Sequence, residues 1–340
     1  MKVLVLGYFG YVTNQIDGQT IKTRDIYNLL EENCKDEVEF FDTQLFKKSK
    51  ISLLKMFFMI FKSDVLFYLP AHNNLKYLFP LIYIVSKLGR VRVNYLVVGG
   101  WLFDFLKKKP VHRYMLSKLS GIYTETENLF NNLKSYNFNN VYKLHNFRIS
   151  APNNLVVKTE VSERLKLVFM ARVHPMKGIG VIFKLSEEIK KRNLKADIDI
   201  YGPIFNDYSD EFFSNVDLTS VRYLGVLDPL DIYGKLNEYD LMLFPTKYYT
   251  EGFPGTILDS YIAGIPVVVT NWLNAHEFVD DEKTGCVVEF NNEELFIEKI
   301  IELISNPEKI YNLKGGVGAK KNQYSSARAW EILENSLYGN

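Results

Sequence analysis

The sequence predicts an α/β protein built from two parallel-sheet domains. Short apolar runs, such as residues 2–6 and 165–170, alternate with amphipathic helical patterns, which is the order that parallel sheets require. A stretch at 146–160 carries Pro152 and lacks a hydrophobic period, so we expect a linker there. We therefore predict one domain over 1–148, a second over 149–322, and a final helix over 323–340 that crosses back to the first domain.

Composition supports two cores and limits the function classes. The chain has 340 residues, 47% of them apolar, and carries a net charge of +1. Residues 1–150 hold 21 Lys and Arg against 12 Asp and Glu, whereas the remaining residues hold 20 against 28. The first half is therefore basic and the second acidic, which indicates different partners for the two halves.

Cysteine use and hydropathy exclude several classes. Cys34 and Cys286 lie far apart, so neither a disulfide framework nor a cysteine metal site is expected. The apolar run after Met1 is too short for a signal peptide, and no run reaches the roughly 18 apolar residues of a membrane span. We expect a cytoplasmic protein.

The sequence pattern of the first half predicts alternating strands and helices. Gly7 ends the first strand, and a polar loop containing Asp17 and Gly18 precedes a helix that places Lys22 and Arg24 on its polar face. A loop in this position is a usual ligand site in open α/β sheets, although a plain turn fits equally well. The expected strands are 2–6, 38–41, 64–69, 90–98, 121–124 and 141–144, and the clearest helices are 21–30, 47–62 and 75–88.

The helix expected at 47–62 combines lysines with large apolar residues. At 100° per residue its lysines fall within one sector, and apolar side chains fill the rest. This pattern is typical of a basic helix on an anionic membrane surface, but a core helix with a solvated lysine edge gives the same pattern. The lysines are Lys47, Lys48, Lys50, Lys55 and Lys62.

The second half repeats the alternation and contains the most informative loop. Between strands expected at 241–244 and 267–269 lies the segment Glu251–Asp259, in which Gly252 and Gly255 allow close approach of a ligand to the backbone. A helix that starts near Gly255 offers free N–H groups to a phosphate, and the two acids can accept hydrogen bonds from sugar hydroxyls. An ordinary turn with helix-capping acids is the alternative. The other expected strands are 165–170, 197–201 and 221–224, and the helices are 179–191, 230–236, 293–304 and 325–337.

Arg172 and Lys177 lie in the segment Ala-Arg-x-His-Pro-Met-Lys-Gly, and Glu251 to Asp259 has the pattern acid, seven residues, acid. Together these motifs resemble the basic pair and the acid motif of the retaining family 4 glycosyltransferases that build bacterial polysaccharides. The resemblance implies a GT-B fold, with two Rossmann-like domains facing a central cleft. It also implies an N-terminal domain that binds the acceptor and a C-terminal domain that binds a nucleotide sugar. One residue departs from the pattern, because Asp259 stands where the family usually has Glu.

The resemblance also implies a role for each motif residue. Arg172 and Lys177 would neutralise the donor diphosphate, Glu251 would bind donor sugar hydroxyls, and the shorter Asp259 would reach the ribose directly or through water. The catalytic candidates are Arg172, Lys177 and Glu251, and no catalytic base is proposed. The remaining donor-binding candidates are Gly7, Gly18, Gly252, Phe253, Pro254, Gly255 and Thr256.

The histidines and the Asp197-Ile-Asp199 sequence do not indicate a metal site. The five histidines lack ligand spacing, and His174 is expected to bond backbone in its loop. Asp197 and Asp199 imitate an Asp-x-Asp metal motif, but their strand periodicity places both on one solvent-facing side. We therefore expect neither a metal nor a cofactor, apart from a UDP- or GDP-sugar as co-substrate.

The predicted function is a retaining, metal-independent hexosyl transfer to a saccharide acceptor. A lipid-diphosphate-linked saccharide at the anionic inner face of the cell membrane is the expected acceptor, because the first half is basic. A nucleotide-sugar epimerase and a non-catalytic nucleotide-sugar-binding subunit remain as alternatives. Nucleic-acid binding is not expected, because the basic half lacks a recognisable motif.

Overall fold

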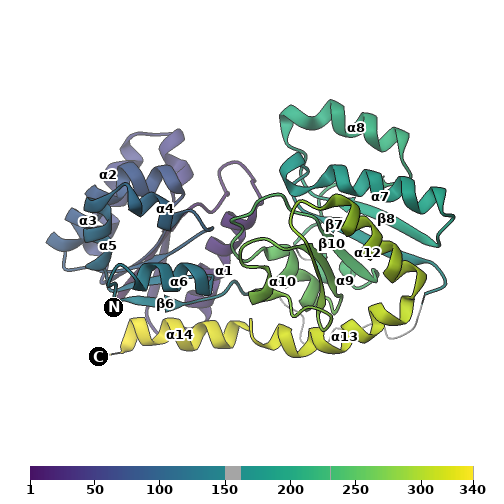
Figure 1. Ribbon diagram of the computed structural model, residues 1–340. Coiled ribbons are helices and arrows are strands. Elements are labelled where there is room, and N and C mark those ends of the chain that lie inside the picture. The colour runs from purple at the N-terminus through teal and green to yellow at the C-terminus, as the bar shows by residue number, and fades with distance from the viewer. Residues whose placement is uncertain (150–161, 230, 340) are drawn as a thin grey trace. The chain divides into compact units, whose positions relative to one another are not determined.

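The computed structural model describes residues 1–149, 162–229 and 231–339 (Figure 1). These residues form two compact units. The first comprises Met1–Ile149 together with Tyr324–Asn340, and the second comprises Ser150–Gln323. Most of the stretch predicted as a linker, and Leu230 of the predicted helix 230–236, lie outside the described residues.

The first unit contains a six-stranded parallel sheet in the order β2-β1-β3-β4-β5-β6. Alternate residues of the apolar strands face opposite sides, so that Val3 and Val5 join one core and Leu4 and Leu6 the other. Burial on both sides explains why these strands read as continuous apolar runs. The strands are β1 (Lys2–Gly7), β2 (Glu37–Asp42), β3 (Val65–Leu69), β4 (Arg92–Leu96), β5 (Gly121–Thr124) and β6 (Val141–Lys143).

Helices cover both faces of this sheet. The core on one side includes residues of α1 and α14, and the core on the other side includes residues of α2 to α6. The helices are α1 (Gly18–Asn33), η1 (Thr43–Lys47), α2 (Ile51–Lys62), η2 (Asn74–Leu78), α3 (Phe79–Leu88), α4 (Leu102–Lys107), α5 (Pro110–Ser117), α6 (Glu127–Lys134) and α14 (Ser326–Tyr338).

The second unit contains another six-stranded parallel sheet, in the order β12-β11-β10-β7-β8-β9. Its strands are β7 (Leu165–Met170), β8 (Ala196–Tyr201), β9 (Arg222–Tyr223), β10 (Leu241–Phe244), β11 (Val267–Thr270) and β12 (Gly285–Val288). Its helices are η3 (Pro175–Lys177), α7 (Ile179–Lys191), η4 (Asn206–Tyr208), α8 (Ser209–Leu218), α9 (Ile232–Leu236), α10 (Gly255–Ile262), α11 (Ala275–Phe278), α12 (Glu293–Ser305) and α13 (Pro307–Asn322).

The predicted fold class, two Rossmann-like parallel-sheet domains, is confirmed. Two details differ from the prediction. The helix expected over 47–62 begins only at Ile51, because Lys47 ends η1 and residues 48–50 separate the two helices. Lys22, expected on a polar helix face, is only 6% exposed. Within the described part of the chain, no helix is both long enough and apolar enough to span a bilayer.

Candidate functional site

The predicted donor-binding residues of the second unit gather where its strand order reverses. From β7 the chain proceeds to β8 and β9 on one side, and then returns to β10 on the other side. In open α/β sheets, the crevice outside the carboxyl ends of two such strands is the usual ligand site. Arg172 and Lys177 follow β7, and Glu251 follows β10, so the topology brings both motifs to the same edge.

The loop after β7 is fixed by its own backbone and by the neighbouring strand end. His174 caps η3, since its Nδ1 lies 3.1 Å from the Met176 N–H, as expected for a loop histidine bonded to backbone. Gly178 has a φ of +81°, and a Cβ at this position would lie 1.9 Å from the carbonyl oxygen of Pro245. Only glycine therefore fits this close approach, which sets Lys177 against the loop after β10.

Glu251 is held from three directions. Its carboxylate pairs with the Lys177 ammonium and accepts a hydrogen bond from Thr246 Oγ1 at 3.2 Å. Its carbonyl oxygen accepts a hydrogen bond from Asn274 Nδ2 at 2.7 Å. The structure thus joins two predicted residues that lie 74 positions apart in sequence.

The Lys177–Glu251 pair is partly open to solvent. The two side chains are 22% and 16% exposed. The Lys177 ammonium also lies 5.1 Å from the ring centre of Tyr248 and 5.5 Å from that of Phe244, so aromatic faces border the charge. An anion that reaches this point meets a cation already held in place.

Helix α10 begins beside the pair with its N-terminus uncapped by a side chain. Pro254 is the N-cap residue and forms no side-chain capping bond, so the first N–H groups of the helix are not occupied in that way. Thr256 Oγ1 donates to the Met170 carbonyl at 2.6 Å, which ties this helix to the end of β7. Phe253 stacks on Phe278 with ring centres 4.1 Å apart, and this stacking anchors the buried stretch from Gly252 to Pro254.

Asp259, one turn inside α10, is only 4% exposed. Tyr233 Oη of α9 donates to its carboxylate at 3.4 Å. The contact of Asp259 with a ribose stays a prediction. Arg172 is exposed on the loop after β7, and its contact with a diphosphate likewise stays a prediction.

Gly7 and Gly18 belong to the first unit, where Gly7 ends β1 and Gly18 begins α1. A Cβ at Gly7 would lie 2.8 Å from a methyl group of Thr23, whereas one at Gly18 would meet nothing within 4 Å. Asp17 caps α1 through the backbone N–H groups of Gln19 and Thr20. The proposed approach of these glycines to the donor, and the predicted cleft, stay predictions.

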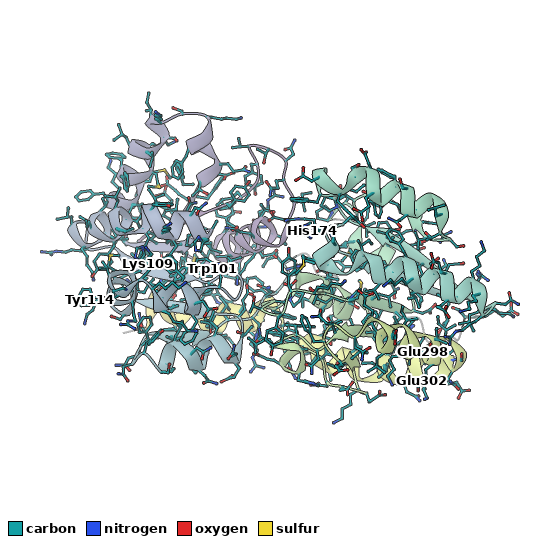
Figure 2. All side chains as sticks on the ribbon, turned by 45° about the horizontal axis from the view of Figure 1, so that its top comes forward. Trp101, Lys109, Tyr114, His174, Glu298 and Glu302 are labelled. Carbon is teal, nitrogen blue, oxygen red and sulfur yellow. The ribbon has the colours of Figure 1, made fainter. Side chains whose placement is uncertain are left out.

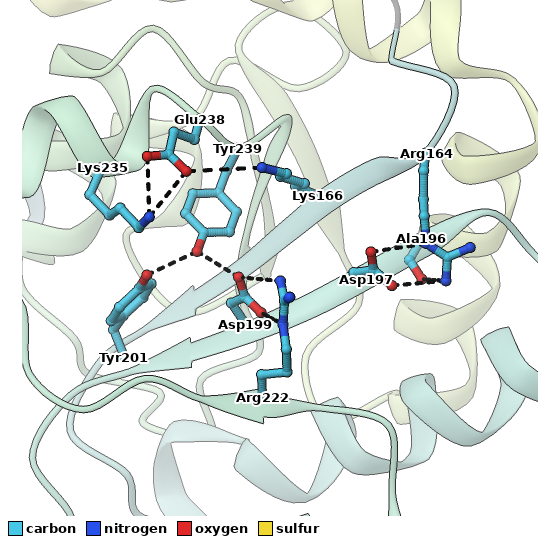
Figure 3. Close-up of polar contacts among 10 residues, drawn as sticks. All are labelled: Arg164, Lys166, Ala196, Asp197, Asp199, Tyr201, Arg222, Lys235, Glu238 and Tyr239. Carbon is cyan, nitrogen blue, oxygen red and sulfur yellow. Dashed lines mark hydrogen bonds and ion pairs between the residues drawn. The ribbon is translucent and has the colours of Figure 1, made fainter.

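Asp197 and Asp199 serve in ion pairs within the second unit (Figure 3). Arg164 binds Asp197 and lowers the pKa of its carboxyl group, while Arg222 Nε donates to Asp199 at 2.7 Å. Asp199 also accepts a hydrogen bond from Tyr239 Oη at 2.7 Å. The expectation that both acids face solvent is wrong for Asp199, which is 4% exposed because Arg222 and Tyr239 cover it. Among the described residues, no group of three or more His, Cys, Asp or Glu side chains is arranged to hold a metal ion.

Sequence reasoning missed the residues that support the site. Thr246 and Asn274 fix Glu251, and Tyr233 contacts Asp259. Thr246 had one detectable signal, since it is a polar residue one position after the Pro245 that follows a buried strand. Asn274 and Tyr233 carry no local signal, because their role depends on tertiary contacts.

Comparison with known proteins agrees with this geometry. Residues 164–306 match the family model described as "Glycosyl transferases group 1". The chain is also similar to the structure of the Anabaena protein HepE with UDP and glucose, at 16% identity and a TM-score of 0.78, with both chains covered completely. The chain has the GT-B fold. The resemblance to glycosyltransferases of bacterial polysaccharide synthesis is confirmed, and residues 164–306 carry the family match.

Other relatives share the GT-B fold or parts of the sequence. The lipopolysaccharide outer core galactosyltransferase WaaB is 13% identical to this chain, with a TM-score of 0.68, and the match covers 99% of both chains. The capsular polysaccharide biosynthesis glycosyltransferase CapM of Staphylococcus aureus is 28% identical over 184 residues, which are 52% of this chain and 47% of CapM. The putative glycosyltransferase EpsF of Bacillus subtilis is 23% identical over 36% of this chain and 33% of its own length. The matched segments thus span less than half of these two curated relatives.

Proposed function

We propose that this GT-B chain is a glycosyltransferase of bacterial surface-polysaccharide synthesis, which moves a sugar from a nucleotide sugar to a saccharide. The observation that carries the proposal is the partly open Lys177–Glu251 pair at the reversal of strand order, beside the N-terminus of α10. A cation, an acceptor-only carboxylate and helix N–H groups that no side chain caps are the groups that a sugar diphosphate requires. Two similar proteins support the same proposal, since CapM is a capsular polysaccharide biosynthesis glycosyltransferase and HepE has a crystal structure in complex with UDP and glucose.

The proposed mechanism begins with charge on the leaving group. As the bond between the sugar and the diphosphate breaks, negative charge grows on the diphosphate, and positive character grows on the anomeric carbon. Lys177 and Arg172 stabilise that negative charge, and the N–H groups at the start of α10 add their dipoles. The fixed loop after β7 keeps Lys177 in position, so little reorganisation is needed during the reaction.

Glu251 takes a second role once a diphosphate binds Lys177. Its carboxylate then accepts hydrogen bonds from donor sugar hydroxyls, while Thr246 orients the carboxylate and Asn274 holds the Glu251 backbone carbonyl. Asp259 accepts from the ribose, either directly or through water, in competition with Tyr233.

The finer assignment is a retaining, metal-independent hexosyl transfer from a UDP- or GDP-sugar. The acceptor attacks from the face that the diphosphate leaves, and a diphosphate oxygen takes the acceptor proton, so the protein supplies no base. The acceptor is a saccharide on a lipid diphosphate at the inner face of the membrane, which fits the basic first half.

A thermal-shift experiment with UDP, GDP, UDP-glucose and GDP-mannose tests the donor site. A ligand at 100 times its dissociation constant adds about 2.7 kcal/mol to the free energy of unfolding, so the correct nucleotide raises the melting temperature clearly. We expect one nucleotide to do so in the wild type and less in Lys177→Ala. An absence of shift with all four compounds would contradict the proposal.

An acceptor-dependence assay separates transfer from epimerisation. A transferase forms product only when a saccharide acceptor is present, whereas an epimerase needs only the nucleotide sugar. Conversion of the nucleotide sugar to its epimer without an acceptor would overturn the transferase assignment, and binding without any turnover would favour a non-catalytic subunit.

A further inference from the structure

Helix α2 exposes an apolar face. Its exposed positions recur at helical spacing and carry Ile51, Leu54, Phe58 and Phe61, which are 75%, 72%, 58% and 53% exposed. An ordinary surface helix turns such side chains inward and its polar residues outward. The buried positions Met56 and Ile60 lie on the opposite side of the helix. A core helix would be packed on both sides of its apolar arc, and α2 is packed on only one.

The segment η2–α3, which packs against α2, repeats this pattern. Its buried residues include Leu75, Phe79 and Ile82, and its exposed positions carry large apolar side chains at the same spacing. These exposed residues are Tyr77, Leu81, Ile84 and Leu88. Two neighbouring helices therefore each leave an apolar stripe uncovered, which is unusual for a single soluble unit.

Helix α5 continues the surface, since it packs against α3. Val111 and Tyr114 are 65% and 63% exposed, and Tyr114 projects from the left of the first unit in Figure 2. We call the exposed apolar residues of α2, η2–α3 and α5 the outer face.

Cations are interleaved with the outer face. The ammonium of Lys62 lies 4.2 Å from the ring centre of Phe58, and that of Lys76 lies 4.6 Å from the ring centre of Tyr77. The flexible stem of lysine lies along apolar surface while its charge reaches toward polar groups. Lysines beside exposed aromatic rings are the arrangement of proteins that lie in a membrane interface.

Acids are nearly missing from this part of the sequence. Residues 43–124 contain fourteen Lys and Arg against two acids, Asp64 and Asp104. A segment with this excess of positive charge attracts an anionic partner within about one Debye length, roughly 8 Å at physiological salt. Two copies of the chain that met through the outer face would instead bring two positive surfaces together.

We propose that the outer face docks on an anionic lipid surface, with Leu54, Phe58, Leu81 and Ile84 entering the interface and Lys55, Lys62 and Lys87 binding the headgroups. A lipid surface satisfies both observations together, because it offers apolar chains beneath a layer of negative charge. Nucleic acid does not, since it offers no partner to exposed aliphatic side chains. Docking would hold the first unit beside lipid-linked acceptors, so the inference deepens the proposed function without depending on the transfer chemistry.

Vesicle flotation of the full chain tests the proposal. We expect co-flotation with phosphatidylcholine vesicles that contain about one third phosphatidylglycerol, weaker flotation with pure phosphatidylcholine, and a decline as salt rises. The double variant Leu54→Gln/Phe58→Gln should lower the partition coefficient at least about tenfold, because two large apolar side chains no longer leave water. Lys55→Glu/Lys62→Glu should abolish the preference for anionic vesicles.

Matched controls come from the second unit. Leu218→Gln on α8, at an 81% exposed position, and Lys195→Glu, at a side chain 70% exposed, should leave flotation unchanged. Melting temperature confirms that each variant folds. A wild type that does not float, or a Leu218 variant that loses as much flotation as the α2 variant, would overturn the proposal. So would a dimer in gel filtration that the α2 variant dissociates, because a second copy would then be the occupant.

The flotation result does not depend on the proposed activity. Donor and acceptor are both left out, and UDP-induced thermal shift measures the second unit separately. A variant that no longer floats but whose melting temperature still rises with UDP has a defect confined to the outer face. Flotation without a rise in melting temperature with any nucleotide would contradict the proposed function alone.

Discussion

Each unit carries a lysine–glutamate pair near the carboxyl edge of its sheet, and the two pairs differ in exposure. In the first unit, Lys22 of α1 pairs with Glu125, which follows β5, and both side chains are 7% exposed. Lys22 also donates to the Val97 carbonyl at 2.8 Å, so its hydrogen bonds are made inside the unit. In the second unit, Lys177 and Glu251 are 22% and 16% exposed.

From this difference we infer that the first pair is structural and that the second pair is available to a ligand. Charges removed from water are costly unless they remain paired, so the Lys22–Glu125 pair must stay closed in the folded state. The Lys177–Glu251 pair can exchange its partner for a ligand, because solvent already reaches it. The closed pair should therefore matter for stability, and the open pair for activity.

The largest expected effect is on stability, at the closed pair. Lys22→Met leaves the Glu125 carboxylate buried without its cation, which should lower the free energy of unfolding by about 3–5 kcal/mol. Urea unfolding measures this change. The double variant Lys22→Met/Glu125→Leu should recover most of it, and a single variant within about 1 kcal/mol of wild type would contradict the structural role.

At the open pair, the effect should appear in catalysis. Lys177→Ala and Glu251→Gln should each lower kcat/KM for transfer about 10²- to 10³-fold, because each removes a preorganised group from the transition state. The free energy of unfolding should change by only about 1 kcal/mol, because solvent reaches this pair in the folded state. Lys184→Ala, at a 62% exposed side chain of α7, is the matched control and should keep full activity. Undiminished transfer in both site variants would refute the site assignment.

The smallest expected effect on stability is at a third, more exposed group of charges in the second unit, in which one glutamate pairs with two lysines. Glu293 lies 2.6 Å from both Lys184 Nζ and Lys247 Nζ, and these ammonium groups lower the pKa of its carboxyl group. Since the pKa is lower in the folded state, the stabilisation is complete above the unfolded value of about 4.3 and is lost as pH falls through the folded value.

Comparison of wild type with Glu293→Gln measures this contribution. At pH 7 the difference in free energy of unfolding should be about 0.2–1 kcal/mol, and it should disappear in acid. If the difference in free energy of unfolding grew as pH fell, the pKa of Glu293 would not be lowered by folding.

Much of the fold was predictable because buried parallel strands have a strong local signature. The apolar runs at residues 2–6 and 165–170 became β1 and β7, and Gly7 marked the carboxyl end of β1. The start of α2 was misplaced, because the lysines before Ile51 continue the helical pattern, although Lys47 belongs to η1 and Lys48 and Lys50 lie between η1 and α2.

The site was predictable in outline but not in its contacts. Strand order places the Lys177 and Glu251 loops on one edge, whereas their ion pair, and its support by Thr246 and Asn274, depend on tertiary packing. The burial of Lys22 was missed for the same reason, since helical periodicity alone put it on a polar face. Periodicity also identified the apolar arc of α2, but it cannot tell whether a core or another surface covers that arc.

The packing of α14 on α1 has a consequence for biosynthesis. Ala329, Leu333 and Leu337 of α14 complete a core that also contains Ile26 and Leu29, while the second unit is continuous from Ser150 to Gln323. Domains generally fold as units during synthesis, starting from the N-terminus. Here the ribosome must translate the whole second unit before α14 can complete the core of the first unit. The second unit therefore has all of its residues before the first unit does.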